Sequence, residues 1–281
     1  MKKILVTILL GLSLLTLAAC GEVVDPNGNN NQPKPPIDDT CDFGEIPIEP
    51  DGELKQIDRT FTGHFDTMLA VRIYVEEDFD PTPVWNELEE TFKTIHQLAT
   101  RFEDYSGVVN VKYLNDNRDE AHVVDQHLID MTMLAHEYYE KTNGLFNVAL
   151  GPVLDVWDYY REECLNFGTC EVPTNAELES ANRYVNMDNI VVDPEASTIM
   201  LKNGTTLDLG GIGKGYAAAV AGEVLKAHPE VYKFMLNAGE SNIEFYGEHP
   251  VRETGEWTIR VTHPDNTNPF MADWYARIQA F

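Results

Sequence analysis

The segment Leu207–Ala219, "LDLGGIGKGYAAA", constrains the fold most. It joins an apolar run to an alanine-rich run through closely spaced glycines. Glycine is costly to hold in order, so this density predicts a tight bend or a close approach of the backbone. A strand ending at Leu209 and a helix starting near Lys214 place free N–H groups beside a positive helix end, which favours anion binding. The glycines alone are equally typical of close helix–sheet packing without a ligand.

Two known phosphate-binding loops are excluded by spacing. A Walker A loop has Gly-x-x-x-x-Gly-Lys-Ser/Thr, but Asp208 occupies the place of the first glycine and Gly215 follows Lys214. A dinucleotide-binding fingerprint has Gly-x-Gly-x-x-Gly after an opening strand. Here Gly211, Gly213 and Gly215 recur at every second residue, late in the chain.

The flanking patterns predict an α+β fold, because helices and strands are mixed without regular βαβ units. Asp125 is the expected N-cap and Gly144 the expected C-terminal glycine of one helix, and Thr174 and Glu177 form an expected capping box. We expect strands at 65–77, 233–239, 242–247 and 257–263, and three more strands within 189–209. We expect helices at 81–103, 125–144, 151–157 and 215–227.

The N-terminus resembles a secretory signal. Lys2 and Lys3 precede an apolar run from Ile4 to Leu17, and "LAAC" ends at Cys20. This pattern predicts a lipoprotein signal peptide at 1–20 with Cys20 as the lipidated first residue. The alternative is a short membrane helix, for which the run is too short. Residues 21–54, rich in Asn, Pro and Gly, predict a flexible tether to a domain at 55–281, anchored at the cell membrane and facing outside the cytoplasm (periplasm or cell surface).

The net charge limits the expected binding partners, and the cysteines indicate a disulfide. The net charge of −27, from 47 acidic and 20 basic residues, argues against nucleic acid and anionic lipid heads as partners. Cys164 and Cys170 bracket a short loop-like segment and predict a disulfide in an oxidising compartment, with two free thiols as the alternative. Cys41 would then be unpaired.

Three motifs carry a family resemblance: "TNGLFNVALGPVLDVW" (142–157), "LDLGGIGKGYA" (207–217) and "LNAGESNI" (236–243). In this order behind a lipobox, the chain from about Phe65 onward resembles the FAD:protein FMN transferases, the ApbE lipoproteins. The resemblance implies a single T-fold-related domain of mixed, mainly antiparallel sheet with packed helices. It also implies Mg²⁺-dependent transfer of FMN from FAD to a Thr or Ser hydroxyl of a target flavoprotein, with release of AMP.

The resemblance also implies site residues. Asp208 and Lys214 would contact FAD, and the carbonyl of Gly211 would bind Mg²⁺. Further FAD-contacting positions are Leu145, Phe146, Asn147, Phe65 and Phe102. From the residues alone, Asp208 is equally a turn cap and Lys214 a solvated helix residue, while Phe65, Leu145 and Phe102 are equally core residues.

The chain departs from the family pattern in several places. Asn147 and Ala219 stand where the family often has Asp, and Gly239–Ser241 stands where it has Gly-Gly-Asp. The family usually continues past Phe281 with the side chains that complete the Mg²⁺ site, so we expect a fragment whose catalytic residues lie beyond Phe281. Hydrolysis of FAD to FMN and AMP, and a non-catalytic FAD-binding or scaffold lipoprotein, remain the alternatives. Gly213 is expected to need a positive φ or to face the ligand, and Gly215 to tolerate a methyl group.

Overall fold

A computed structural model describes residues 52–239, 241–261 and 274–278. The predicted signal peptide, Cys20, Cys41 and all but the last three residues of the predicted tether lie outside the described residues. The chain divides into two compact units, one formed by 49–247 and one that contains 248–281. No helix among the described residues is long and apolar enough to cross a membrane.

The larger unit is built on a four-stranded antiparallel sheet in the order β1-β2-β6-β7. The strands are β1 (Lys55–His64), β2 (Thr67–Val75), β6 (Lys233–Ala238) and β7 (Ile243–Tyr246). Every second residue of β2 from Leu69 to Val75 is buried, as expected for a strand with one face on the core. Opposite Leu69 lie Phe61 of β1 and Ala238 of β6.

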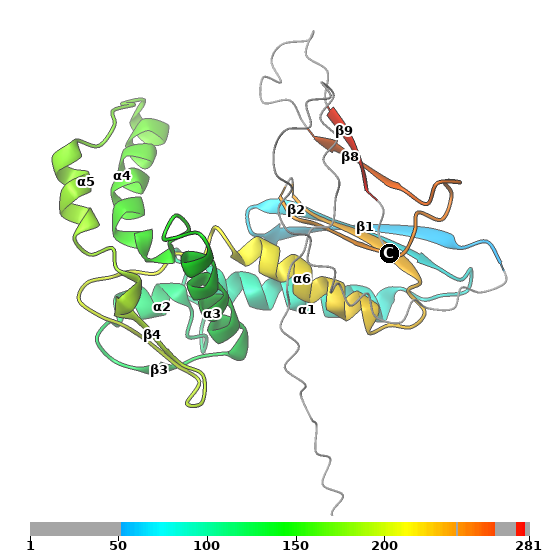
Figure 1. Cartoon of the computed structure of the whole chain (residues 1–281), viewed down its shortest axis with the longest axis horizontal. Helices are drawn as coiled ribbons and strands as arrows, with labels where there is room; N and C mark the ends of the chain where they lie inside the picture. Colours follow the sequence, from blue (N-terminus) through cyan, green and yellow to red (C-terminus); the bar gives the residue numbers. More distant parts are fainter. Residues whose placement is uncertain (1–51, 240, 262–273, 279–281) are drawn as a thin grey trace, which may run out of the picture. The chain divides into compact units, whose positions relative to one another are not determined.

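Two helices, α1 (Thr82–Ala99) and α6 (Gly213–Lys226), lie side by side along this sheet (Figure 1). In α1 the buried residues recur at helical spacing, with Leu88, Phe92 and Ile95 fully covered. The ring of Phe92 meets that of Phe61 on β1 edge to face, with centroids 5.2 Å apart. The core therefore lies between the helix pair and the sheet.

The same unit also contains a helical part with a small antiparallel sheet in the order β3-β5-β4. Its elements are α2 (Val111–Asp116), β3 (His122–Val123), α3 (Gln126–Lys141), α4 (Gly151–Phe167), α5 (Asn175–Asn182), β4 (Ile190–Asp193) and β5 (Thr198–Leu201), with 3₁₀ turns η1 (Val148–Leu150) and η2 (Met187–Asn189). The predicted N-caps are confirmed: Asp125 accepts from the N–H of His127, and Thr174 and Glu177 form the reciprocal capping box. The predicted C-terminal glycine is one residue off, because α3 has its C-cap at Thr142 and Asn143, with φ 51°, directly follows it, ahead of Gly144.

Several predicted boundaries were wrong. The expected strand at 65–77 starts at Thr67, because Phe65 and Asp66 form a hairpin turn with a preceding strand, β1, that the sequence did not suggest. The expected third strand within 189–209 does not form. Instead, the N–H of Leu207 donates to the side-chain oxygen of Asn115, and the Asn115 amide donates to the carbonyl of Leu207. The N–H of Asp208 donates to the carbonyl of Val148. Helix α6 starts at Gly213, before the predicted position.

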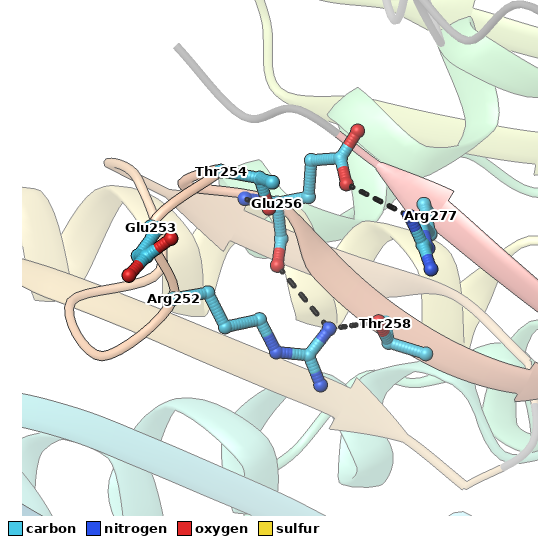
Figure 2. Close-up of a pocket in the computed structure, with 6 residues that line it drawn as sticks. All are labelled: Arg252, Glu253, Thr254, Glu256, Thr258 and Arg277. Carbon is cyan, nitrogen blue, oxygen red and sulfur yellow. Dashed lines mark hydrogen bonds and ion pairs between the residues drawn. The ribbon is translucent and has the colours of Figure 1, made fainter.

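The unit that contains 248–281 has one described antiparallel pair, β8 (Trp257–Val261) with β9 (Trp274–Ile278). A surface pocket of about 710 Å³ lies beside it, lined by Arg252, Glu253, Thr254, Glu256, Thr258 and Arg277 (Figure 2). The two arginines are already engaged within the pocket: Arg252 bonds Thr258, and Arg277 pairs with Glu256 at 3.7 Å.

The end of α4 confirms the predicted disulfide. Gly168 stops the helix in the left-handed conformation, with φ 72°, and its N–H donates to the carbonyl of Cys164. Cys164 in the last turn is bonded to Cys170 beyond the cap.

The fold class is also confirmed. The described strands pair only antiparallel, in three sheets. Helices pack on the larger sheet and around the smaller one in the 49–247 unit. The predicted α+β class with a mainly antiparallel sheet therefore holds.

Candidate functional site

The glycine turn leads directly into the N-terminus of α6. The N–H groups of Ile212 and Gly213 both donate to the carbonyl of Leu209, at 3.0 and 2.8 Å. Among the described residues, the N–H groups of Gly211, Lys214 and Gly215 have no hydrogen-bond acceptor. Free N–H groups at the positive end of a helix form a site suited to an anion.

Lys214 adds a charge at the same place. Its side chain is half-buried, and no described carboxylate lies within the 4.0 Å that defines an ion pair. Lys226, at the other end of α6, does have such a partner and pairs with Glu223 at 2.8 Å. An ammonium without a described carboxylate partner, next to unpaired N–H groups, suits a phosphate ligand.

Asp208 has two fixed partners. One carboxylate oxygen accepts the N–H of Gly210 at 2.8 Å, which closes the turn, and the other accepts from Arg101 at 3.0 Å. The turn-capping alternative is therefore what the structure shows. The carboxylate that the resemblance assigns to FAD binding is also part of an ion-pair cluster.

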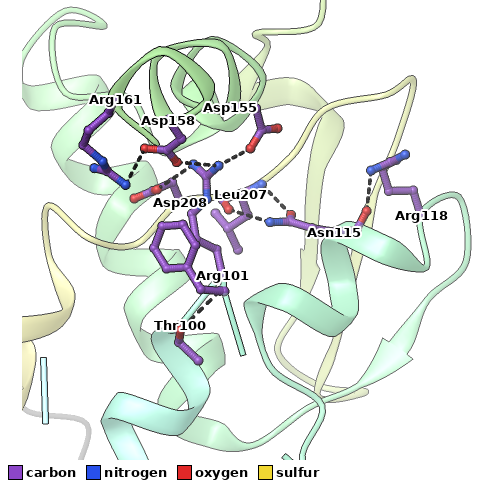
Figure 3. Close-up of polar contacts among 10 residues, drawn as sticks. Thr100, Arg101, Asn115, Arg118, Asp155, Asp158, Arg161, Leu207 and Asp208 are labelled. Atoms are coloured by element: carbon purple, nitrogen blue, oxygen red, sulfur yellow. Dashed lines mark hydrogen bonds and ion pairs between the residues drawn. The ribbon is translucent and has the colours of Figure 1, made fainter. Parts of the chain in front are cut away.

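Arg101 is the centre of that cluster (Figure 3). Its side chain is only 8% exposed, and its guanidinium contacts Asp208, Asp158 at 3.4 Å, and Asp155. Asp158 also pairs with Arg161 at 2.9 Å. Burial raises the pKa of the Asp155 carboxyl, Arg101 opposes the rise, and the acidic neighbours add to it. A buried arginine among three carboxylates ties the glycine turn to α4 and to the end of α1.

Two aromatic rings flank the start of α6. Phe146 lies against the turn, because a Cβ added to Gly211 would be 3.3 Å from its ring. Phe65 lies against the first residue of the helix, with a ring carbon 3.8 Å from the corresponding position at Gly213. Both rings are half-buried and pack against the core. The structure thus brings together Phe65, Phe146, Gly211, Asp208 and Lys214.

The other predicted contact residues lie less centrally. Leu145 is 89% exposed and Phe102 is 61% exposed, so the core alternative is wrong for both. The Arg101 guanidinium lies over the Phe102 ring, 5.2 Å from its centroid, so Phe102 joins the cluster from its outer side. The side chain of Asn147 accepts from the N–H of Ala149 and caps η1, so its oxygen is already bonded.

One of the two glycine expectations needs correction. Gly213 does not have a positive φ; it is buried, and a Cβ there would approach the Cβ of Ala99 on α1 to 3.3 Å. The expected positive φ is therefore wrong, and close packing of α6 on α1 disfavours a side chain at this position. A Cβ on Gly215 would lie 3.0 Å from the end of the exposed Asn242 side chain, so the tolerance of a methyl group there depends on a small shift of that amide and stays a prediction. Position 239 requires glycine, because its φ is 63° and the Thr67 side chain occupies the place of a Cβ.

The described residues do not complete a metal site. Gly211 offers its carbonyl at an exposed position, but no group of three or more His, Cys, Asp or Glu side chains in the described part of the chain is placed to hold a metal ion. A second surface groove, of about 540 Å³ between α4 and α5, shares Asp155 with the Arg101 cluster. Neither pocket is lined by Lys214, Phe65 or Phe146.

The sequence did not point to Arg101, Asp155, Asp158 or Asn115. Asp155 and Asp158 are three residues apart and so share one face of α4, a pattern that favours a nearby cation. That spacing was a usable signal for the acidic side of the cluster. The identity of the cation was not readable, because Arg101 and Asp208 are 107 residues apart.

Two curated relatives share part of this chain. A FAD:protein FMN transferase of Klebsiella pneumoniae (strain 342) is 25% identical over 184 residues, 60% of this chain and 51% of the relative. A FAD:protein FMN transferase of Treponema pallidum (strain Nichols) is 27% identical over 215 residues, 72% of this chain and 56% of the relative. The chain thus spans about half the length of these relatives.

Solved structures agree on the fold. The ApbE protein of Thermotoga maritima MSB8 superposes with a TM-score of 0.64 at 25% identity, covering 80% of this chain and 68% of that one. The flavin transferase ApbE of Vibrio cholerae gives 0.65 at 17% identity, covering 80% and 69%. The ApbE family model matches residues 65–279, which include the glycine turn, the Arg101 cluster and both flanking phenylalanines. On this match, the chain belongs to the ApbE family.

Proposed function

We propose that this chain is a FAD:protein FMN transferase. It would move FMN from FAD to a Thr or Ser hydroxyl of a target flavoprotein and release AMP. Support comes from the family membership, the names of the two curated relatives and the geometry at α6. The observation that carries the proposal is Lys214, without a carboxylate partner among the described residues, beside the free N–H groups of Gly211 and Gly215.

The residues have distinct roles in the proposal. The free N–H groups and Lys214 hold the diphosphate of FAD, and Phe65 and Phe146 present aromatic surface beside it. Asp208 fixes the turn through Gly210 and is itself fixed by Arg101. In the reaction the acceptor oxygen bonds to the FMN phosphorus, the bond from that phosphorus to the AMP oxygen breaks, and the hydroxyl proton leaves to a base.

Mg²⁺ belongs to the proposal through the family resemblance. The Gly211 carbonyl is the one predicted ligand in the described residues, and it does not make a site by itself. We therefore assign no step to the ion and no described residue to the role of base. Lipid anchoring through Cys20, on the outer side of the cell membrane, is likewise proposed from the sequence.

Hydrolysis of FAD is the second enzyme candidate, because it uses the same diphosphate site with water in place of the acceptor hydroxyl. Mass spectrometry of the acceptor distinguishes the two. Transfer adds one FMN group to the acceptor, whereas hydrolysis leaves the acceptor unchanged and releases free FMN. A chain that binds FAD and does neither would be a binding protein.

Lys214→Ala is expected to weaken FAD binding by about 1.5–3 kcal/mol, the usual contribution of a charge-assisted hydrogen bond. Isothermal calorimetry with FAD measures the loss. Lys226→Ala is the matched control, since Lys226 lies on the same helix and pairs with Glu223. Equal FAD affinities for the Lys214 variant and the unmodified chain would show that Lys214 does not contribute to FAD binding.

A further inference from the structure

The turn between β1 and β2 has an unusual composition. Its central residues, Phe65 and Asp66, both have left-handed backbones, with φ 53° and 52°. His64 and Thr67 pair on either side, so this is a two-residue hairpin loop of the kind that normally takes Asn-Gly. A bulky residue in the left-handed region is strained and persists only where its surroundings hold it.

His96 of α1 holds this turn. The N–H of Phe65 donates to Nδ1 of His96 at 3.1 Å. The two rings also meet edge to face, with centroids 5.4 Å apart. Nδ1 can accept only when it carries no proton, so the bond requires the neutral imidazole with its proton on Nε2. On that side, Nε2 faces the hydroxyl oxygen of Tyr105 at 3.5 Å.

We infer that His96 is a positioning residue for the FAD site: its neutral ring holds the strained Phe65 turn against the start of α6, and protonation releases it. The inference rests on the proposed function, because it takes the Phe65 ring as part of the FAD site. The effect of His96 on the turn itself can be measured without FAD.

The surroundings of His96 favour the neutral ring. Burial lowers the pKa of His96, and the neighbouring His64, with ring centroids 6.0 Å apart, lowers it further. Asp66 on the turn and Glu103 on the loop after α1 oppose this effect. His64 itself bonds Glu89 on the outer side, at 2.9 Å.

Tyr105 keeps its proton beside His96. Its hydroxyl donates to Glu103 at 2.7 Å, and this bond raises the pKa of Tyr105 to about 12. The phenol therefore stays neutral over the whole range in which a histidine titrates. Any change in the Phe65 turn over that pH range is then not caused by titration of Tyr105.

The direction of the pH dependence follows from the lowered pKa. The unfolded chain takes up a proton at His96 near the ordinary pKa of about 6.5, before the folded chain does. The bond from the Phe65 N–H to His96 is therefore fully formed above about pH 6.5. It is lost as the pH falls through the lower pKa that His96 has in the folded chain. FAD affinity and the protection of the Phe65 amide should fall over the same range.

The test uses the full chain, as unmodified protein and as His96→Asn, His96→Ala and His136→Asn. Asparagine keeps an oxygen acceptor near the place of Nδ1 but does not titrate, whereas alanine removes the acceptor. His136, half-buried on α3, is the histidine substituted as the control. Hydrogen exchange of the Phe65 amide, corrected for intrinsic rates, and the Kd for FAD are measured between about pH 7.5 and about pH 4.5.

In the unmodified chain and in His136→Asn, protection and affinity should both fall about five- to tenfold on acidification, the value of one hydrogen bond. His96→Asn should keep both values at either pH, and His96→Ala should show the reduced values throughout. Protection that does not change with pH in the unmodified chain, or an asparagine variant that titrates like it, overturns the inference. If no variant binds FAD, the proposed function fails, and amide exchange still decides whether His96 holds the turn.

Discussion

Replacing Arg101 by methionine is expected to lower the free energy of unfolding by about 3–5 kcal/mol at neutral pH. The Arg101 side chain is 8% exposed, and its loss leaves Asp155, Asp158 and Asp208 facing one another without their shared cation. Urea unfolding followed by circular dichroism measures the change.

The same variant should regain stability in acid. Burial already raises the pKa of Asp155, and Arg101→Met removes the guanidinium that opposes this rise. The folded variant then takes up a proton at Asp155 at a higher pH than the unfolded chain does. The loss of stability should therefore shrink as the pH falls toward the ordinary carboxyl range, and a loss that grows in acid would argue against this explanation.

Arg161→Met is the matched control for this cluster. Arg161 pairs with Asp158 at 2.9 Å, but its side chain is 59% exposed, so its loss should lower stability by at most about 1 kcal/mol. Adding Asp208→Asn to Arg101→Met should recover part of the stability, since one uncompensated charge is removed. Equal losses for the two arginine variants would show that Arg101 is not the centre of the cluster.

Gly213→Val is expected to destabilise the fold by about 1–3 kcal/mol through overpacking. A Cβ at this position would already lie 3.3 Å from the Cβ of Ala99 and 3.8 Å from the Phe65 ring, and valine adds two further methyl groups to this close contact between α1 and α6. Thermal unfolding monitored by circular dichroism measures the effect. FAD affinity should fall as well, because the same packing sets the position of the helix end.

Gly222→Ala on the same helix separates packing from helix propensity. A Cβ there would make only ordinary contacts, 3.8 Å from Phe234 and 3.9 Å from Glu244. Alanine should therefore be neutral or stabilise by up to about 1 kcal/mol. If Gly213→Val proved as stable as Gly222→Ala, the close contact between α1 and α6 would not explain why a glycine starts this helix.

Patterns in the sequence predicted the parts of the fold that depend on local physics. Asp125, Thr174 and Glu177 cap their helices through bonds to residues two or three positions away, so their pattern was readable. Strand β1 was missed because it lies at the edge of the sheet and most of its residues are exposed, which removes the alternation that marks a strand.

The candidate site was predicted only in part. The glycine turn and Lys214 form one segment, and the spacing of that segment carries the signal of an anion site. The Arg101 cluster instead joins the end of α1, α4 and the turn, and the Phe65–His96 bond joins residues 31 positions apart. Such contacts follow from how helices and strands pack, and a single sequence does not display them.

Binding of the FAD diphosphate at the N-terminus of α6 is the assignment on which the other roles depend. The sharpest measurement is a titration of the ¹⁵N-labelled chain with FAD, with riboflavin as the ligand lacking phosphate, followed by amide chemical shifts. We expect the amides of Gly211, Lys214 and Gly215 to shift with FAD and to stay unchanged with riboflavin. Shifts confined to the pocket around Arg252 and Arg277, with those three amides unmoved, would be incompatible with a diphosphate site at α6.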